Sequence, residues 1–182
     1  MSLTYGVAVL ARPTFDVPFA EDMKNLAFAA LEAAGIRAVG PRELLFDRAA
    51  AERAIDEIRS AGPIDLLLIL QITFTDATMT VKLAKEATTP IAIWAVPEPR
   101  IGGRLRLNAY CGLNLAAHAL GRAGVPHGWL YADPGSRGIA ASLHALAKPA
   151  KSVPSRARPS AAAAASADAR ADAVLDTLRG AK

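Results

Sequence analysis

Cysteine is scarce in this sequence of 182 residues, and long hydrophobic runs are absent. The single cysteine, Cys111, excludes an internal disulfide framework and fits a reducing compartment, so we expect a cytoplasmic protein. An uninterrupted apolar stretch of about 18 residues, which would indicate a transmembrane helix, is missing. The first residues also lack the basic and apolar regions of a signal peptide. We therefore expect no membrane as a partner.

Histidine is also rare, and no catalytic motif is recognisable. His118, His127 and His144 are not spaced with each other, with cysteine or with carboxylates as metal ligands would be. The sequence contains no phosphate-binding loop and no Ser-His-Asp arrangement, and Gly102-Gly103 lies too late for a dinucleotide fingerprint. Cys111 stands at an expected helix start, where a thiolate is favoured, but burial against the sheet is the preferred interpretation. The sequence thus predicts neither a metal site nor a catalytic residue in this chain.

Aromatic residues make up only 5% of the sequence, and the charge is uneven. Seven of the 21 basic and three of the 17 acidic residues lie in residues 148–182, which leaves 14 of each sign in residues 1–147. A nucleic-acid-binding domain needs a basic face on its folded part, with aromatic side chains among the basic ones. The neutral body therefore argues against nucleic acid as a partner.

Apolar runs of strand length alternate with helix patterns along residues 1–147. Continuous apolar character, clearest in residues 65–72 (DLLLILQI), is typical of parallel strands that are covered on both faces. Helix starts are indicated by Pro18, by Asp47 and by Asp76 or Thr75, and glycine ends the first and fourth helices. The expected strands are residues 6–11, 36–39, 65–72, 91–96 and 128–132, and the expected helices are residues 18–34, 47–58, 76–87, 109–123 and a last one to about 147. This order predicts an α/β fold, a flavodoxin-like doubly wound five-stranded parallel sheet of order 2-1-3-4-5.

The remaining residues divide into two segments. Residues 148–160 contain three prolines with serines and basic residues, which is typical of a linker. Residues 161–182 are rich in alanine and predict a helix, although their apolar edge is thin. We therefore expect a domain over residues 1–147, a basic linker over 148–160, and a helix over 161–182 that leads toward a second domain absent from this chain.

The most informative segment is residues 97–108 (PEPRIGGRLRLN), here called the arginine loop. It joins an expected strand to an expected helix, and it is roughly twice as long as the usual connection of about 2–6 residues. It carries three arginines, a glutamate, an asparagine and two adjacent glycines. Long polar loops at the carboxyl ends of parallel strands are where α/β domains place ligand contacts. The alternative is a solvated surface insertion.

In the expected fold, polar side chains from three loops meet at one edge of the sheet. Glutamine, threonine, asparagine and an aromatic ring suit a polyhydroxylated ligand, and arginines suit a carboxylate, phosphate or sulfonate. The alternative is that the arginines pair with Glu98 and Asp76 as solvated loop charges. The candidate substrate-binding residues are Arg12, Thr14, Phe15, Gln71, Thr73, Phe74, Trp94, Glu98, Arg100, Arg104, Arg106 and Asn108.

Four segments resemble the N-terminal domain of the L-fucose isomerase-like proteins, which are related to L-fucose and L-arabinose isomerases. These segments are residues 65–77, 90–94, 97–108 and 111–118, and the resemblance extends over roughly 5–147. Residues 173–182 also resemble the connection into the second domain of that family.

The resemblance implies aldose–ketose isomerisation of a sugar, assisted by Mn²⁺. In that family the metal ligands lie in later domains, and the N-terminal domain supplies substrate contacts, typically to the site of a neighbouring subunit. Carried over to this sequence, the contacts come from the arginine loop and from Arg12, Thr14, Gln71, Thr73, Phe74 and Trp94.

The main hypothesis is therefore the substrate-contacting domain of a sugar isomerase-like protein that is catalytically incomplete alone and binds no cofactor itself. Its partners would be a sugar-like molecule and either further copies of itself or a chain that carries the remaining isomerase domains. One alternative is a free-standing binding or regulatory module for an anionic or polyhydroxylated metabolite. Another is a structural subunit that completes a larger partner.

Overall fold

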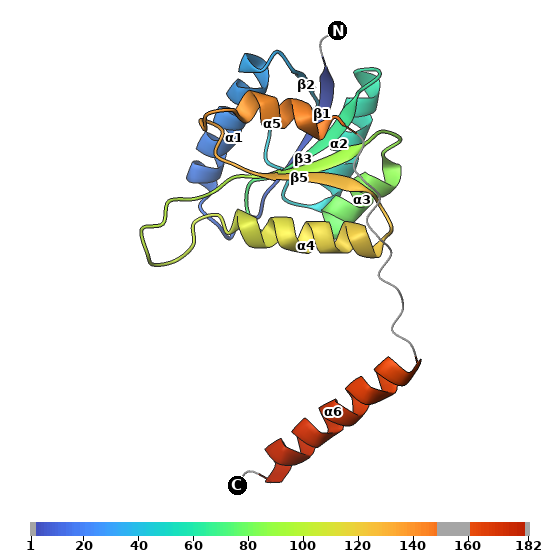
Figure 1. Ribbon diagram of the computed structural model, residues 1–182. Coiled ribbons are helices and arrows are strands. Elements are labelled where there is room, and N and C mark those ends of the chain that lie inside the picture. The colour runs from blue at the N-terminus through green and yellow to red at the C-terminus, as the bar shows by residue number, and fades with distance from the viewer. Residues whose placement is uncertain (1–2, 149–160, 181–182) are drawn as a thin grey trace.

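The computed structural model describes residues 3–148 and 161–180 (Figure 1). Strands and helices alternate through the first of these ranges, as the sequence predicts. The strands are β1 (Thr4–Leu10), β2 (Arg37–Val39), β3 (Leu66–Gln71), β4 (Ile91–Ala95) and β5 (His127–Tyr131). The helices are α1 (Val17–Ala33), α2 (Arg48–Ser60), α3 (Thr78–Glu86), α4 (Ala109–Arg122), α5 (Ile139–Leu146) and α6 (Ala161–Gly180).

The five strands form one parallel sheet in the order β2-β1-β3-β4-β5, which confirms the predicted flavodoxin-like fold. Helix α1 packs with α5 on one face, while α3 packs between α2 and α4 on the other, so the sheet lies between two helical layers (Figure 1). Because all strands run the same way, their carboxyl ends and the loops that follow them lie along one edge.

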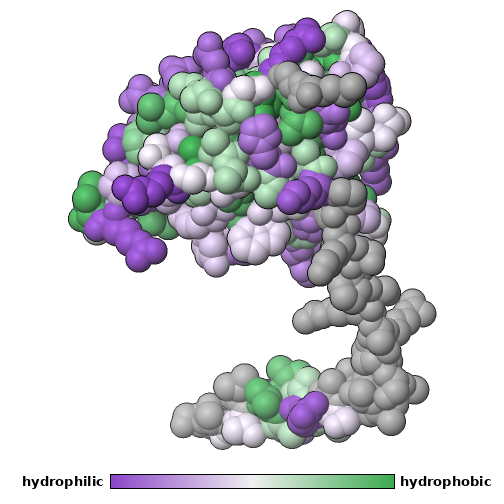
Figure 2. All heavy atoms as spheres, turned by 45° about the horizontal axis from the view of Figure 1, so that its top comes forward, coloured by the Kyte–Doolittle hydropathy of each residue, from purple (hydrophilic) through white to green (hydrophobic). Residues whose placement is uncertain are grey.

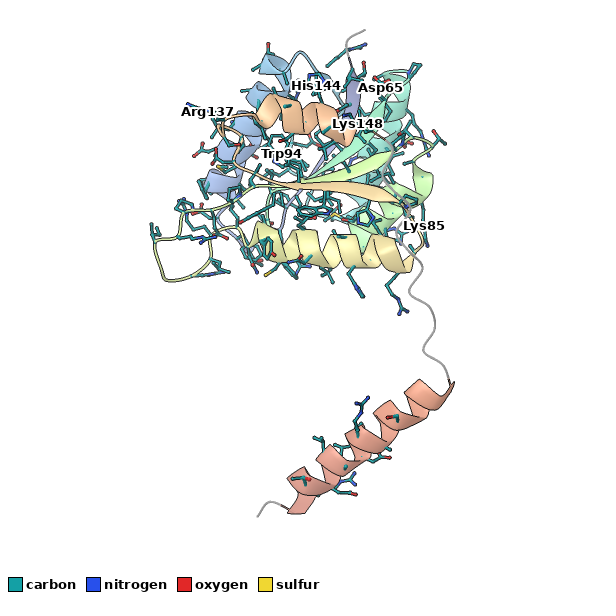
Figure 3. The ribbon with its side chains drawn as sticks, in the orientation of Figure 1. Asp65, Lys85, Trp94, Arg137, His144 and Lys148 are labelled. Carbon is teal, nitrogen blue, oxygen red and sulfur yellow. The ribbon has the colours of Figure 1, made fainter. Side chains whose placement is uncertain are left out.

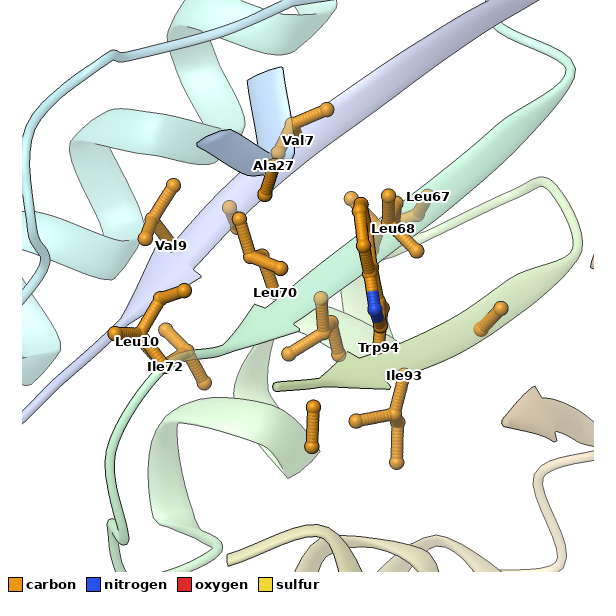
Figure 4. Packing of buried hydrophobic residues seen from close by; sticks show 14 of the residues in the cluster. Val7, Val9, Leu10, Ala27, Leu67, Leu68, Leu70, Ile72, Ile93 and Trp94 are labelled. Carbon is orange, nitrogen blue, oxygen red and sulfur yellow. The ribbon is translucent and has the colours of Figure 1, made fainter. Parts of the chain in front are cut away.

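The core lies on both faces of the three central strands. All residues of β3 and β4 are buried, as are those of β1 after Thr4. Leu68, Leu70 and Trp94 lie among the side chains that fill the space around the sheet (Figure 4). The buried Tyr5 hydroxyl donates a 2.7 Å hydrogen bond to the Leu143 carbonyl and so ties β1 to α5. Burial, assisted by the negative charge of Asp65, raises the pKa of Tyr5 to about 12.

Local capping explains where two of the helices begin. Asp16 and Asp47 each accept a hydrogen bond from a backbone N–H in the first turn, those of Phe19 (3.1 Å) and Ala50 (2.8 Å). The predicted cap of α3 was wrong, because Ala77 occupies that position and makes no side-chain cap. Asp76 lies one residue earlier and accepts from the backbone of Thr78 at 3.1 Å.

Helix α1 buries Phe28 and leaves Leu26 54% exposed. Phe28 packs under the guanidinium of Arg42, which lies 4.0 Å from the ring centroid.

The C-terminal alanine-rich segment forms helix α6, in agreement with the sequence, and those of its side chains that are described are exposed. Most of the expected linker, residues 149–160, lies outside the described residues, so the proposed domain boundaries stay a prediction. Among the described helices, none combines the length and the apolar character needed to span a bilayer.

Replacing Gly40 by alanine is expected to destabilise the fold more than the same change at Gly62. Both glycines have positive φ, 108° and 97°, so both substitutions carry the strain of the left-handed region. At Gly40 an added Cβ would also lie 2.9 Å from the Val7 carbonyl oxygen and 2.7 Å from Ile58, whereas at Gly62 nothing lies within 4 Å. We expect Gly40→Ala to lower the free energy of unfolding by about 1–3 kcal/mol more than Gly62→Ala in urea titrations. Equal losses would show that the β1–α2 packing yields to the extra methyl group.

Candidate functional site

The arginine loop lies along the carboxyl edge of the sheet, between β4 and α4. Figure 1 shows it extending from the body at the edge where the strands end. At its tip, Ile101 is 78% exposed and Leu105 is 54% exposed, and Figure 2 shows hydrophobic and hydrophilic residues side by side there. The loop is attached at its base to the two loops that follow β1 and β3.

The carboxylate of Glu98 holds the base of the loop. One oxygen, Oε2, accepts hydrogen bonds from the backbone N–H groups of Arg106 and Leu107 (2.9 Å for Leu107), and Oε1 accepts from that of Asn108 at 2.7 Å. Asn108 has φ 53°, the only positive φ of a non-glycine residue in the described part of the chain. These bonds turn the loop back toward α4. Glu98 therefore faces the loop's own backbone, and both of its oxygens are engaged there.

Arg106 connects the loop to the start of α1. Its Nε lies 2.7 Å from Asp16 Oδ2, and its carbonyl accepts from the Asp16 backbone N–H at 3.0 Å. Its guanidinium also lies 3.8 Å from the centroid of the Phe19 ring. The hydrogen bond from Arg106, together with the one from the Phe19 backbone, holds the pKa of Asp16 below its ordinary value. Arg106 thus has a positioning role within the fold.

Arg104 and Leu107 add two further attachments. Arg104 Nη2 donates to the Thr14 carbonyl at 2.8 Å, and the Leu107 carbonyl accepts from the Phe74 backbone N–H at 2.8 Å. The loop and the β1–α1 connection enclose a hollow of about 280 Å³ that is lined by Thr14, Phe15, Asp16, Arg104, Leu105 and Arg106. Five predicted site residues, Thr14, Phe15, Arg104, Arg106 and Glu98, are therefore brought together around this junction.

Arg12 lies on the neighbouring part of the edge. Its backbone N–H donates to Thr73 Oγ1 at 2.8 Å, and its Nη2 lies 2.6 Å from Asp76 Oδ2. Its guanidinium is 5.8 Å from the centroid of the Phe74 ring, which in turn lies 6.5 Å from the ring of Phe15. The sequence left open that arginines pair with Glu98 and Asp76 as solvated loop charges. Asp76 does pair with an arginine, Arg12. Glu98 instead accepts hydrogen bonds from backbone N–H groups.

Gln71 and Thr73 lie beneath this edge and are fully buried. Gln71 Nε2 donates to the Thr73 carbonyl at 2.6 Å and to Thr75 Oγ1 at 3.0 Å. Its Oε1 is buried and has no hydrogen-bond partner among the described residues. Gly112 of α4 leaves room for this amide, since a Cβ there would lie 3.1 Å from Gln71 Nε2.

Two expectations from the sequence differ from the structure. Trp94 is fully buried, and its indole Nε1 donates to the Ala132 carbonyl at 3.0 Å (Figure 3), so the ring presents no surface to a ligand. Cys111, expected to be buried, is exposed. Helical spacing explains the second difference, because the buried positions of α4 are Ala109, Gly112, Leu113, Ala116 and Leu120.

Two tyrosines that the sequence pattern did not single out lie at the same edge. Tyr131 ends β5, and Tyr110 lies in the first turn of α4, with ring centroids 5.0 Å apart. The available signal was position alone: one residue closes the last strand, and the other follows the arginine loop.

Comparison with known proteins assigns the chain to a family. The family described as "Fucose/sulfoquinovose isomerase, N-terminal domain" matches residues 6–155. The chain belongs to this family. Sulfoquinovose isomerases from Priestia aryabhattai and Priestia megaterium are each 27% identical over 130 residues, or 71% of this chain and 29% of the relative. The enzyme of Alkalicoccus urumqiensis is 26% identical over 144 residues, 79% of this chain and 32% of the relative.

The chain thus spans about a third of the length of the curated relatives that it matches. The predicted resemblance is confirmed, and the chain is an isomerase-like domain of sugar metabolism.

This isomerase-family domain offers no fitting place for Mn²⁺ in the residues described. Over residues 3–148 and 161–180, no three His, Cys, Asp or Glu side chains gather as metal ligands. His118 is exposed. The rings of His127 and His144 each make a 2.9 Å hydrogen bond to a backbone carbonyl, those of Val125 and Ala34.

Glu98→Gln is expected to loosen the base of the arginine loop. The amide nitrogen of glutamine cannot accept a hydrogen bond, and the bonds that remain lose their charge assistance. We expect a loss of about 1.5–3 kcal/mol in the free energy of unfolding, and faster hydrogen exchange at the amides of Leu107 and Asn108. Glu43→Gln is the control, because Glu43 is an exposed carboxylate with no ion pair among the described residues. Unchanged exchange at both amides would show that the loop holds its shape without the carboxylate.

Proposed function

We propose that this domain forms one substrate-binding wall of an aldose–ketose isomerase that acts on a sugar with an anionic group. The observation that carries the proposal is the arginine loop, which is held at its base by Glu98 and presents arginines at the carboxyl edge of the sheet. The relatives are named sulfoquinovose isomerases, so the sugar that we propose is sulfoquinovose. A planar guanidinium can donate two parallel hydrogen bonds to a sulfonate, as it does to carboxylate and phosphate.

The arginines divide between positioning and binding. Arg106 and Arg12 are paired with Asp16 and Asp76, so their charges are largely compensated within the domain. Arg104 donates one hydrogen bond to the Thr14 carbonyl and keeps further N–H groups. Arg100 is exposed and forms no ion pair with the described residues. We assign substrate contact to Arg100 and Arg104, and the orientation of the loop to Arg106.

In this proposal the domain recognises the sugar and does not catalyse alone. Manganese ion would polarise the sugar oxygens during proton transfer, and its ligands would come from the domains that make up the rest of the relatives' length. Those domains would belong to the same longer protein or to a partner chain, in a cytoplasmic oligomer. The role of the present residues is to hold the anionic end of the sugar and to exclude water around it.

A binding module is the second candidate. The hollow between the arginine loop and the β1–α1 connection brings Thr14 together with Arg104 and Arg106, and these groups could hold an anionic or polyhydroxylated metabolite.

An activity assay separates the two functions. We expect sulfoquinovose isomerisation with Mn²⁺ when the chain is combined with the domains that complete the relatives, and no turnover by the chain alone. Sugar binding by the chain with no turnover in any combination would favour the module. Turnover by the chain alone would contradict the proposed incompleteness.

Arg100→Ala is expected to impair substrate binding without lowering stability. An exposed charge contributes little to folding, but a lost charged hydrogen bond to a ligand costs about 1.5–3 kcal/mol, which is roughly tenfold or more in affinity. We expect KM for sulfoquinovose to rise by about that factor, while Arg106→Ala lowers the melting temperature because it removes the contacts with Asp16 and Phe19.

Arg53→Ala is the matched control, since Arg53 is an exposed arginine of α2 with no ion pair in the described part of the chain. If Arg100→Ala and Arg104→Ala both keep the full activity of the parent protein, the arginine loop is a solvated surface feature and does not contact the substrate.

A further inference from the structure

An exposed aromatic pair lies at the carboxyl edge on the β5 side of the arginine loop. Tyr131 is the last residue of β5 and is in register with Ala95, the last residue of β4. Tyr110 is the second residue of α4. The two rings are tilted by 59° with centroids 5.0 Å apart, and the residues are 37% and 54% exposed. The pair is thus a preformed aromatic surface that stays open to solvent.

The charged part of the arginine loop borders this surface. Partial burial raises the pKa of Tyr131, the negative charge of Glu98 raises it further, and the positive charge of Arg100 lowers it. Glu98 and Arg100 therefore lie within electrostatic reach of the Tyr131 hydroxyl. Arg100 is an exposed arginine of the loop that forms no ion pair with the described residues, so it adds an available cation to this part of the edge.

The other aromatic rings at or below this edge are less open. Trp94 is inside the core, and the partly buried Phe74 lies beneath the guanidinium of Arg12 and beside the partly buried Phe15. Aromatic side chains gain most from burial, so two neighbouring rings left open next to a candidate binding loop are available to a ligand. The apolar C–H face of a sugar ring or chain fits against such rings, while its hydroxyls remain free for polar groups.

We propose that Tyr110 and Tyr131 form the stacking platform of the sugar site, with Arg100 at its border. This inference rests on the proposed function. It gives the site an apolar aromatic wall in addition to the polar junction at Thr14 and Arg104. The rings, and not the hydroxyl groups, make the contact with the C–H face of the sugar.

The test uses variants that remove the rings but preserve local structure. Tyr110→Leu keeps a good helix former and Tyr131→Val a good strand former, and Tyr110→Phe and Tyr131→Phe keep the rings. In the complete isomerase, the Leu and Val variants should raise KM for sulfoquinovose by about five- to tenfold. The Phe variants should stay within about twofold of the parent protein.

Trp129→Ala provides the control. Trp129 is 64% exposed and precedes Tyr131 by two residues on the same strand, so it is an open aromatic residue farther from the carboxyl edge. The KM of Trp129→Ala for sulfoquinovose should equal that of the parent protein. An equal rise in KM for Trp129→Ala, or no rise for Tyr110→Leu and Tyr131→Val, would overturn the proposal.

A binding measurement separates this inference from the proposed function. Sulfoquinovose titrated into the 182-residue chain should shift the ring proton resonances of Tyr110 and Tyr131 in NMR spectra, whether or not any isomerase activity is found. Shifts of these resonances in the absence of any isomerase activity would support the stacking platform and reject the proposed isomerase function. Activity without such shifts, and with unchanged KM in the ring-removing variants, would reject the platform and retain the isomerase.

Discussion

The candidate site depends on the contact between the Glu98 carboxylate and the backbone N–H groups of residues 106–108. These groups precede the first turn of α4 and have no helical acceptor there, so a carboxylate two residues into the loop is a strong partner for them. The contact closes the loop on itself and fixes Asn108 in the left-handed region immediately before α4 begins. The direction in which Arg100 and Arg104 leave the body follows from this closure, because both lie between the joined ends.

The loop becomes less constrained from its base to its tip. Arg106 at the base is held by Asp16 and Phe19, Arg104 has one bond to the Thr14 carbonyl, and Arg100 has no ion pair among residues 3–148 and 161–180. A rigid base limits the conformational entropy that is lost when a ligand binds, and an unpaired tip leaves charge for the ligand. The three arginines of the loop, which look equivalent in the sequence, are therefore held to different degrees.

The fold was predictable because the local signals agreed with one another. The continuous apolar run of β3, Pro18 at the start of α1, Asp47 at the cap of α2 and the glycines after the first and fourth helices all indicated the same βα repeat. The edge that holds the site followed from that topology and from the length of the arginine loop. The roles of single residues could not be predicted in the same way. A strand that is buried on both faces has no alternation of polar and apolar residues, so the sequence does not show that Trp94 points into the core. Helix phase likewise decides that Cys111 is exposed while Gly112 is buried, and the sequence pattern of α4 leaves that phase ambiguous by one residue.

Three carboxylates of the carboxyl edge favour the proposed role in recognition over one in proton transfer. They are engaged within the domain: Glu98 by backbone N–H groups, Asp16 by Arg106 and the first turn of α1, and Asp76 by Arg12 and Thr78. Hydrogen bonding holds the pKa values of Asp16 and Asp76 below their ordinary value, which makes both poor proton acceptors near neutral pH. The exposed groups of the arginine loop and its surroundings include unpaired arginine, aromatic rings and the apolar Ile101 and Leu105. In the proposed function such a surface would bind and orient the sugar, while the acid–base groups and the metal would face it from the remaining domains.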